Sequence, residues 1–212
     1  MSHARGLLAT AVVLAAALPV GAHDGTAHAR PEGAAAHAAA PLPPPLPFPF
    51  AIGGDFALTD QAGHARTAAD PDGRLQLLFF GYANCQSICS VALPAMAETV
   101  DLLAAQGVAA VPVMITVDPA RDTVATMAEP LAALHPAFVG LTGGEDALAA
   151  AYDAFGVEIS LVFEDPEYGP VYAHGSHVYL LDPAGEVLTL LPPILGPARM
   201  AEIAAGYAAL SD

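Results

Sequence analysis

Two strongly apolar runs, residues 75–80 and 111–117, constrain the fold of this chain more than any other feature. Runs without regular polar alternation are typical of strands that are buried on both faces, as in a largely parallel sheet. A helical pattern follows each run, and after the first run one stripe is formed by Leu93, Met96, Val100 and Leu103. Buried strands that alternate with helices predict a layered α/β domain.

The rest of the chain predicts further elements of both kinds. We expect a short hairpin near residues 56–63, and an extended arm over residues 157–163 is followed by a loop over residues 172–177. The remaining strands are predicted at residues 138–141, 177–181 and 186–191, and the helices at residues 123–134, 144–155 and 197–210. The expected architecture is a mixed central sheet flanked by helices.

The N-terminal region has the composition of targeting and linker sequence. Residues 1–22 contain one Arg, an apolar run and a small-residue end, which is the pattern of a signal peptide. The run is short for a membrane span, which needs about 20 apolar residues, so cleavage or a single uncleaved membrane anchor stay as alternatives. Residues 23–47 read as a linker, and residues 48–212 as the folded domain. The domain is therefore expected to be exported, either periplasmic or anchored facing the periplasm.

The charge of the chain excludes some classes of partner. There are 22 acidic residues against six basic ones, which gives a formal net charge of −16. Nucleic acid and anionic lipid both require a basic surface, so neither is expected as a partner. The acidity fits attraction of cations or of a basic partner, and it also fits a simple contribution to solubility.

Cys85 and Cys89, the only two cysteines, stand at the predicted junction between the first buried strand and its helix. Unpaired N–H groups and the helix dipole at such a junction favour a thiolate. A spacing of four residues can place both sulfurs on one side of a helical turn. A purely structural disulfide across so short a loop would restrain the unfolded chain very little. Two soft thiolates instead suit cuprous ion or a reversible disulfide.

Histidines could supply a third ligand. His174 and His177 lie in the loop that runs into the predicted strand at residues 177–181, and either could complete a three-coordinate site or be an ordinary loop residue. His64 and His135 are weaker candidates. The tract of His23, His28 and His37 could hold copper weakly, but it fits a plain linker better.

Three charged residues follow the second buried strand. Asp118, Arg121 and Asp122 occur directly before the helix predicted at residue 123. The simplest expectation is that the two carboxylates cap this helix and that Arg121 pairs with a carboxylate. The alternative is a role near the functional site, because Asp118 ends a strand at the edge where sites form in such sheets.

Five segments in order resemble the Sco/SenC family of thioredoxin-like copper proteins: residues 52–60, 79–89, 115–123, 138–143 and 179–185. The resemblance covers about residues 52–192 and implies a thioredoxin-like fold that binds cuprous or cupric ion. In the family, the ligand histidine precedes the aromatic residue of the Tyr-Leu-x-Asp-Pro strand by five residues. The resemblance therefore selects His174, five residues before Tyr179, rather than His177.

The chain departs from the family pattern near these residues. Gln86 and Ser90 stand where the family has prolines, and Ala173 precedes His174 where the family has an acidic residue. The missing carboxylate removes a partner that could fix the imidazole tautomer. The departures bear on copper affinity and redox potential more than on ligand identity, and His177 stays an alternative ligand.

The resemblance implies a metallochaperone that binds copper with Cys85, Cys89 and His174. Its implied acceptor is subunit II of cytochrome c oxidase or another exported cuproenzyme. The alternative is an enzyme, a thiol-disulfide oxidoreductase in which Cys85 attacks a partner disulfide and Cys89 resolves the mixed disulfide. Copper sensing or storage is a third interpretation.

Overall fold

The computed structural model describes residues 52–83, 85 and 88–210. The predicted signal segment (1–22), the predicted linker (23–47) and Gln86 lie outside the described residues. Within the part of the chain that is described, no helix is both long and apolar enough to cross a membrane.

A mixed sheet of seven strands forms the centre of the domain, in the order β2-β1-β5-β4-β3-β8-β9. Strands β3, β4 and β5 are parallel, and the outer pairs are antiparallel. This confirms the predicted thioredoxin-like α/β class with a mixed sheet. The strands are β1 Leu58–Asp60, β2 Ala65–Arg66, β3 Leu75–Gly81, β4 Ala110–Thr116, β5 Val139–Thr142, β8 Val178–Leu181 and β9 Val187–Leu191.

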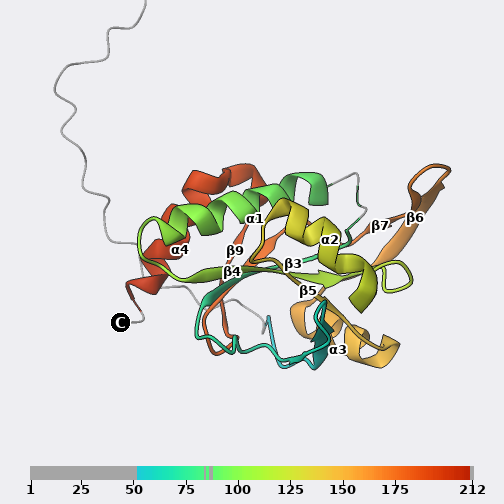
Figure 1. Cartoon of the computed structure of the whole chain (residues 1–212), viewed down its shortest axis with the longest axis horizontal. Helices are drawn as coiled ribbons and strands as arrows, with labels where there is room; N and C mark the ends of the chain where they lie inside the picture. The colour runs from blue at the N-terminus through green and yellow to red at the C-terminus, as the bar shows by residue number, and fades with distance from the viewer. Residues whose placement is uncertain (1–51, 84, 86–87, 211–212) are drawn as a thin grey trace, which may run out of the picture. The chain divides into compact units, whose positions relative to one another are not determined.

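Helices cover both faces of this sheet (Figure 1). Helices α1 (Cys89–Ala104), α2 (Val124–Leu134) and α4 (Pro197–Ala208) lie on one face, and α3 (Glu145–Phe155) lies on the other. A short 3₁₀ turn, η1 (Pro193–Leu195), precedes α4. The predicted stripe of α1 is buried along its whole length, since Leu93, Met96, Val100 and Leu103 all belong to the core. Both faces of β3 are buried, as its apolar run predicts.

A two-stranded hairpin extends away from this layered body (Figure 1). It consists of β6 (Ser160–Asp165) and β7 (Gly169–Ala173). The expectation of a loop from residue 172 was wrong in its first two residues, because Tyr172 and Ala173 pair with Leu161 and Ser160. The Asp165 carboxylate accepts the N–H groups of two turn residues and so closes the hairpin. The pairing of β6 with β7 depends on this turn rather than on burial. An apolar pattern in the sequence therefore does not predict β7.

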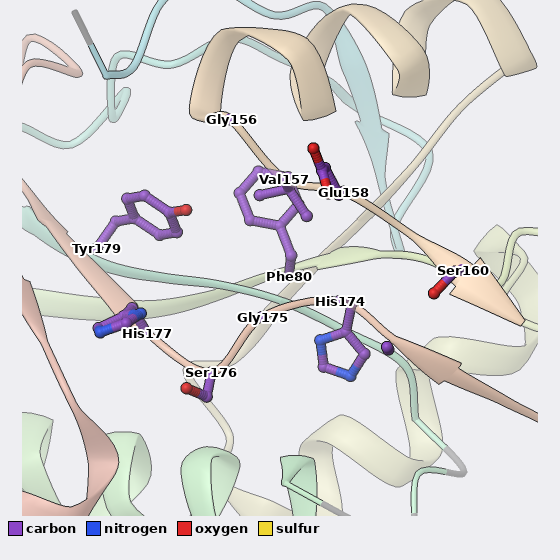
Figure 2. Close-up of a pocket in the computed structure, with 11 residues that line it drawn as sticks. Phe80, Gly156, Val157, Glu158, Ser160, His174, Gly175, Ser176, His177 and Tyr179 are labelled. Carbon is purple, nitrogen blue, oxygen red and sulfur yellow. The ribbon is translucent and has the colours of Figure 1, made fainter. Parts of the chain in front are cut away.

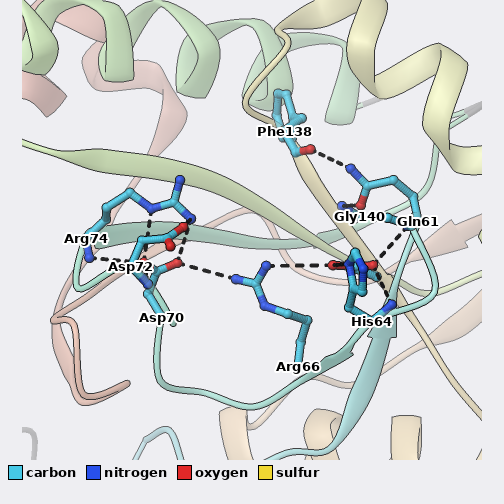
Figure 3. Close-up of polar contacts among 10 residues, drawn as sticks. Gln61, His64, Arg66, Asp70, Asp72, Arg74, Phe138 and Gly140 are labelled. Atoms are coloured by element: carbon cyan, nitrogen blue, oxygen red, sulfur yellow. Dashed lines mark hydrogen bonds and ion pairs between the residues drawn. The ribbon is translucent and has the colours of Figure 1, made fainter.

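A buried carboxylate fastens the connection between β2 and β3 (Figure 3). The side chain of Asp70 accepts hydrogen bonds from the guanidinium groups of Arg74 and Arg66 and from the backbone N–H of Asp72. The Asp70 N–H donates to the carbonyl of Pro183 in the β8–β9 turn. Burial alone would raise the pKa of Asp70, but the hydrogen bonds and the charge of Arg74 outweigh it and hold the pKa below its ordinary value.

We predict that Asp70→Asn lowers the free energy of unfolding by about 3 kcal/mol at pH 7, because it removes the buried carboxylate that both guanidinium groups share. A carboxyl with a lowered folded-state pKa stabilises the fold above its unfolded pKa, and this contribution is lost as pH falls through the folded pKa. The deficit should therefore shrink below about pH 4. Urea unfolding at pH 7 and below about pH 4 measures the loss of stability. Asp72→Asn, at a largely exposed partner of Arg74, is the matched control and should change stability by no more than about 0.5 kcal/mol. Equal losses in the two variants would contradict the assignment.

Candidate metal centre

Strand β3 and helix α1 place the two cysteines. Strand β3 ends at Gly81, and α1 begins at Cys89 with Ile88 as its N-cap. Cys85 thus lies in the connection, and it is Cys89, not Cys85, that occupies the helix start. Both side chains are buried, with Cys85 6% and Cys89 1% exposed, and neither forms a disulfide. Gly81 permits this packing, since a Cβ there would lie 3.1 Å from the Cys89 sulfur.

Strand β8 brings the histidine loop to the same end of β3. Because β8 runs antiparallel to β3, with Tyr179 opposite Leu78, the residues that precede β8 lie beyond the carboxyl end of β3. His174 is 4% exposed there, and its Nε2 lies 3.6 Å from the Cys89 sulfur. Its ring meets Phe79 and Tyr82 edge-on, at centroid distances of 5.7 and 5.8 Å. Two aromatic rings therefore hold the imidazole toward the cysteines.

The structure gathers one potential ligand atom from each of Cys85, Cys89 and His174, all within 4.8 Å of one another. Thiolate sulfur and imidazole nitrogen suit copper or zinc, and zinc in structural sites takes four ligands. Two weaker candidates lie elsewhere: His64 pairs with Asp60, and His135 pairs with Asp101.

A pocket of about 410 Å³ opens beside His174. Figure 2 shows His174 and His177 at opposite ends of the short Gly175–Ser176 segment, with their rings apart. Glu158 and Ser160 line the same pocket. His177 is exposed and takes no part in the group formed with the cysteines.

Electrostatics distinguishes the two thiols in the metal-free state. The pKa of Cys89 is raised, first by its hydrogen bond to Cys85 and then by burial. The two thiolates expected from the sequence belong to the copper-bound state, whereas in the metal-free protein the raised pKa keeps Cys89 a thiol. Burial and a hydrogen bond to Cys85 raise the pKa of Tyr82 to about 12, so this phenol stays protonated at neutral pH. A bound cation would reverse the balance at Cys89, because it favours the anionic sulfur.

One nitrogen of His174 lacks a partner. Its Nδ1 is buried and has no hydrogen-bond partner in the structure. If Nε2 is to offer a lone pair toward the cysteines, a neutral imidazole must carry its proton on Nδ1. The residue before it is Ala173, which has no carboxylate to accept that proton. The structure thus agrees with the sequence-based expectation that a tautomer-fixing partner is missing.

Asp122 ties the cysteine-bearing connection to β4. Its carboxylate accepts the N–H of Ala83 at 3.0 Å and the hydroxyl of Thr116 at 2.8 Å. Burial raises its pKa. The expectation that the aspartates cap the next helix was wrong, because Thr123 is the N-cap of α2 and forms a capping box with Thr126. The carboxylate of Asp122 instead serves the segment that leads to Cys85.

Arg121 joins the hairpin to the site. Its guanidinium pairs with Asp118, as expected for one carboxylate, and donates to the carbonyls of Tyr168 and Pro170 in the hairpin. The same guanidinium lies 5.5 Å from the ring centroid of Tyr82, as a cation–π contact. Sequence reasoning missed both the hairpin contact and Tyr82. The available signal was a tyrosine hydroxyl directly after an otherwise apolar strand.

The fold and this group define a thioredoxin-like domain with a buried Cys-x₃-Cys pair and a histidine from the β7–β8 loop. Comparison with known proteins agrees: the SCO1/SenC family model matches residues 45–209, and the chain belongs to that family. It is 39% identical to a SCO2-like protein of Rickettsia felis over 140 residues, which are 65% of this chain and 67% of the relative.

Solved structures of two relatives share the fold. The structure titled Arabidopsis thaliana ScoI with copper bound has a TM-score of 0.69 and 27% identity, covering 74% of this chain and 99% of that one. Bradyrhizobium japonicum ScoI with copper bound has a TM-score of 0.65 and 32% identity, with the same coverage.

We predict that iodoacetamide modifies Cys85 of the reduced, metal-free protein at least about tenfold faster than Cys89. Cys89 is the more buried thiol and has a raised pKa, so less of it is the reactive thiolate. Peptide mass mapping after brief alkylation at pH 7.5 measures the ratio, and denatured protein, in which both thiols are open, is the control. Preferential labelling of Cys89 in the native protein would contradict the assignment.

Proposed function

We propose that this chain is an exported copper chaperone that holds one copper ion on Cys85, Cys89 and His174 and hands it to a cuproenzyme. The observation that carries the proposal is the buried group of two sulfurs and one imidazole within 4.8 Å of one another. We further propose that the acceptor is subunit II of cytochrome c oxidase. The family resemblance supports this acceptor, and the copper-bound structures of the Arabidopsis and Bradyrhizobium relatives support copper as the cargo.

The donor set supports copper as the cargo. Two thiolates and an imidazole are soft or borderline ligands, which cuprous ion prefers, and the set also suits cupric ion. Three ligands leave a coordination position to which an acceptor can add its own ligand before a sulfur here is released. The copper can then pass between proteins without being free in solution.

The location and charge of the chain are part of the proposal. The signal-like segment at residues 1–22 supports export, to the periplasm or to a membrane tether facing it. The net charge of −16 supports a basic docking surface on the acceptor.

We predict that the reduced protein binds a single equivalent of cuprous ion and that His174→Ala weakens binding at least about tenfold, because the ion loses one of its three ligands. His177→Ala is the matched control, since it removes the other imidazole of the same loop. Titration against a chromophoric cuprous chelator measures both. Unchanged affinity in His174→Ala, or loss in His177→Ala, would remove His174 from the proposed ligand set. Undiminished binding by Cys85→Ala would end the proposal.

Copper affinity should fall as the solution becomes more acid. Because the pKa of Cys89 is raised in the metal-free protein, this thiol is protonated at neutral pH and must release its proton when copper binds. The apparent binding constant should therefore fall by about tenfold or more per unit of decreasing pH near neutrality. Chelator competition from pH 8 to 6, corrected for the chelator's own protonation, measures the slope. A flat profile would mean that copper does not displace a thiol proton.

Thiol-disulfide oxidoreductase activity is the second candidate, favoured by the proximity of two cysteines that form no disulfide and by the greater exposure of Cys85. Cys85 would attack a partner disulfide and Cys89 would release the reduced partner, leaving a Cys85–Cys89 disulfide. Turnover that survives both copper removal and His174→Ala would favour this function. Copper transfer that fails in His174→Ala while disulfide exchange persists would assign the two activities to different parts of one site.

A further inference from the structure

The β6–β7 hairpin carries an exposed apolar surface. Leu161, Val162 and Phe163 on β6 are 54%, 60% and 53% exposed. Tyr168 in the turn is 44% exposed. We call these four residues the apolar patch. The hairpin extends away from the layered body (Figure 1). Neighbouring apolar side chains that stay uncovered on an acidic surface are typical of an interaction site.

A β-bulge shapes the apolar patch. Leu161 pairs with Tyr172 and Phe163 pairs with Val171, so Val162 is an extra residue with no partner position on β7. An extra residue bends and twists its strand and re-aims the side chains around it. Bulges also prevent a strand from pairing along its edge with another chain. The hairpin therefore offers a partner its side chains rather than a free strand edge.

Acidic side chains surround the apolar patch. Glu158, Glu164 and Glu167 are exposed, and Asp165 lies where β6 enters the turn. No Lys or Arg occurs in residues 122–198. A second copy of this chain would bring the same carboxylates against these ones, and like charges disfavour association. Anionic lipid is repelled for the same reason. The complementary surface is one with an apolar centre and Lys or Arg at its rim.

Arg121 fastens the hairpin beside the candidate metal centre. Its guanidinium donates to the carbonyls of Tyr168 and Pro170. A Cβ at Gly169 would lie 2.8 Å from Nη1 of Arg121, and Gly169 has a φ of +77°, so this contact requires glycine. The residue that follows β7 is His174. A partner seated on the apolar patch therefore contacts the hairpin whose second strand leads to His174.

We propose that the apolar patch is the docking surface for the copper acceptor, a protein whose own surface has an apolar centre and a basic rim. This inference deepens the proposed function and rests on it for the identity of the partner. Docking on the hairpin holds the acceptor next to the histidine while the metal is exchanged, so a chance encounter becomes a positioned one.

The test measures the affinity of the reduced, metal-free full chain for the soluble domain of cytochrome c oxidase subunit II from the same organism, by biolayer interferometry. Val162→Ser combined with Phe163→Ser should weaken binding at least about tenfold, because truncation of apolar anchors that an interface buries has this effect. Ile194→Ser is the matched control, since Ile194 is 94% exposed in η1, which packs on α1 and α4. Its affinity should equal that of wild type.

The acidic rim is tested by a second variant. Glu164→Gln combined with Glu167→Gln should weaken binding about threefold at low salt and flatten its dependence on ionic strength, because salt screens the attraction between charged surfaces. Asp165 stays unchanged, since its carboxylate closes the turn. If the Val162/Phe163 variant does not fold, the Glu164/Glu167 variant decides.

Copper titration of each variant separates docking from the proposed function. Both hairpin variants should bind cuprous ion as wild type does, since their substituted residues lie outside the Cys-Cys-His group. A wild-type chain that docks but binds no copper would contradict the proposed function alone.

Three affinity results would overturn the docking proposal: wild-type affinity in either folded hairpin variant, an equal loss in Ile194→Ser, or no binding by wild type. A dimer, or binding to phosphatidylcholine vesicles, that the Val162/Phe163 variant loses would also overturn it, because the apolar patch would then have a different occupant.

Discussion

Strand β3 is the constraint on which the candidate site depends. It pairs in parallel with β4 on one side and antiparallel with β8 on the other, and all its residues are buried. Its register is set by its pairing with both neighbours, with Leu75 opposite Ala110 on β4 and Leu78 opposite Tyr179 on β8. Its carboxyl end leads to Cys85, the end of β4 leads to Asp122, and the start of β8 follows His174. The ligand geometry is thus a consequence of strand register.

The sequence predicts most of this framework, because apolar periodicity reports burial directly. The runs at residues 75–80 and 111–117 became β3 and β4, and the stripe that begins at Leu93 became the buried face of α1. Burial does not determine β7, whose side chains are half-buried or exposed and whose pairing depends on the turn at Asp165. The hairpin was therefore missed as a hairpin, although its first strand was expected to be extended.

Local residue preferences fail where tertiary contacts decide. Asp122 is a residue type that often caps helices, yet its carboxylate accepts hydrogen bonds from the N–H of Ala83 and the hydroxyl of Thr116. Thr123 is the N-cap of α2 instead. The helix start is occupied by Cys89, and there the hydrogen bond to Cys85 and burial raise the pKa against the effect of the helix dipole. The family resemblance, through the spacing to Tyr179, did select the imidazole that lies beside Cys89.

Charge balance connects the hairpin to the site. A cuprous ion held by two thiolates carries a net negative charge, and Asp118 and Asp122 are buried close to the same connection. Arg121 is one of only six basic residues in the chain, and its guanidinium meets Asp118, the Tyr82 ring and two hairpin carbonyls. A buried carboxylate is stabilised by such a partner, while a lost partner leaves an uncompensated charge. The hairpin is thereby attached to the guanidinium that faces the Tyr82 ring, so a change in hairpin position would alter the packing of Tyr82 beside His174.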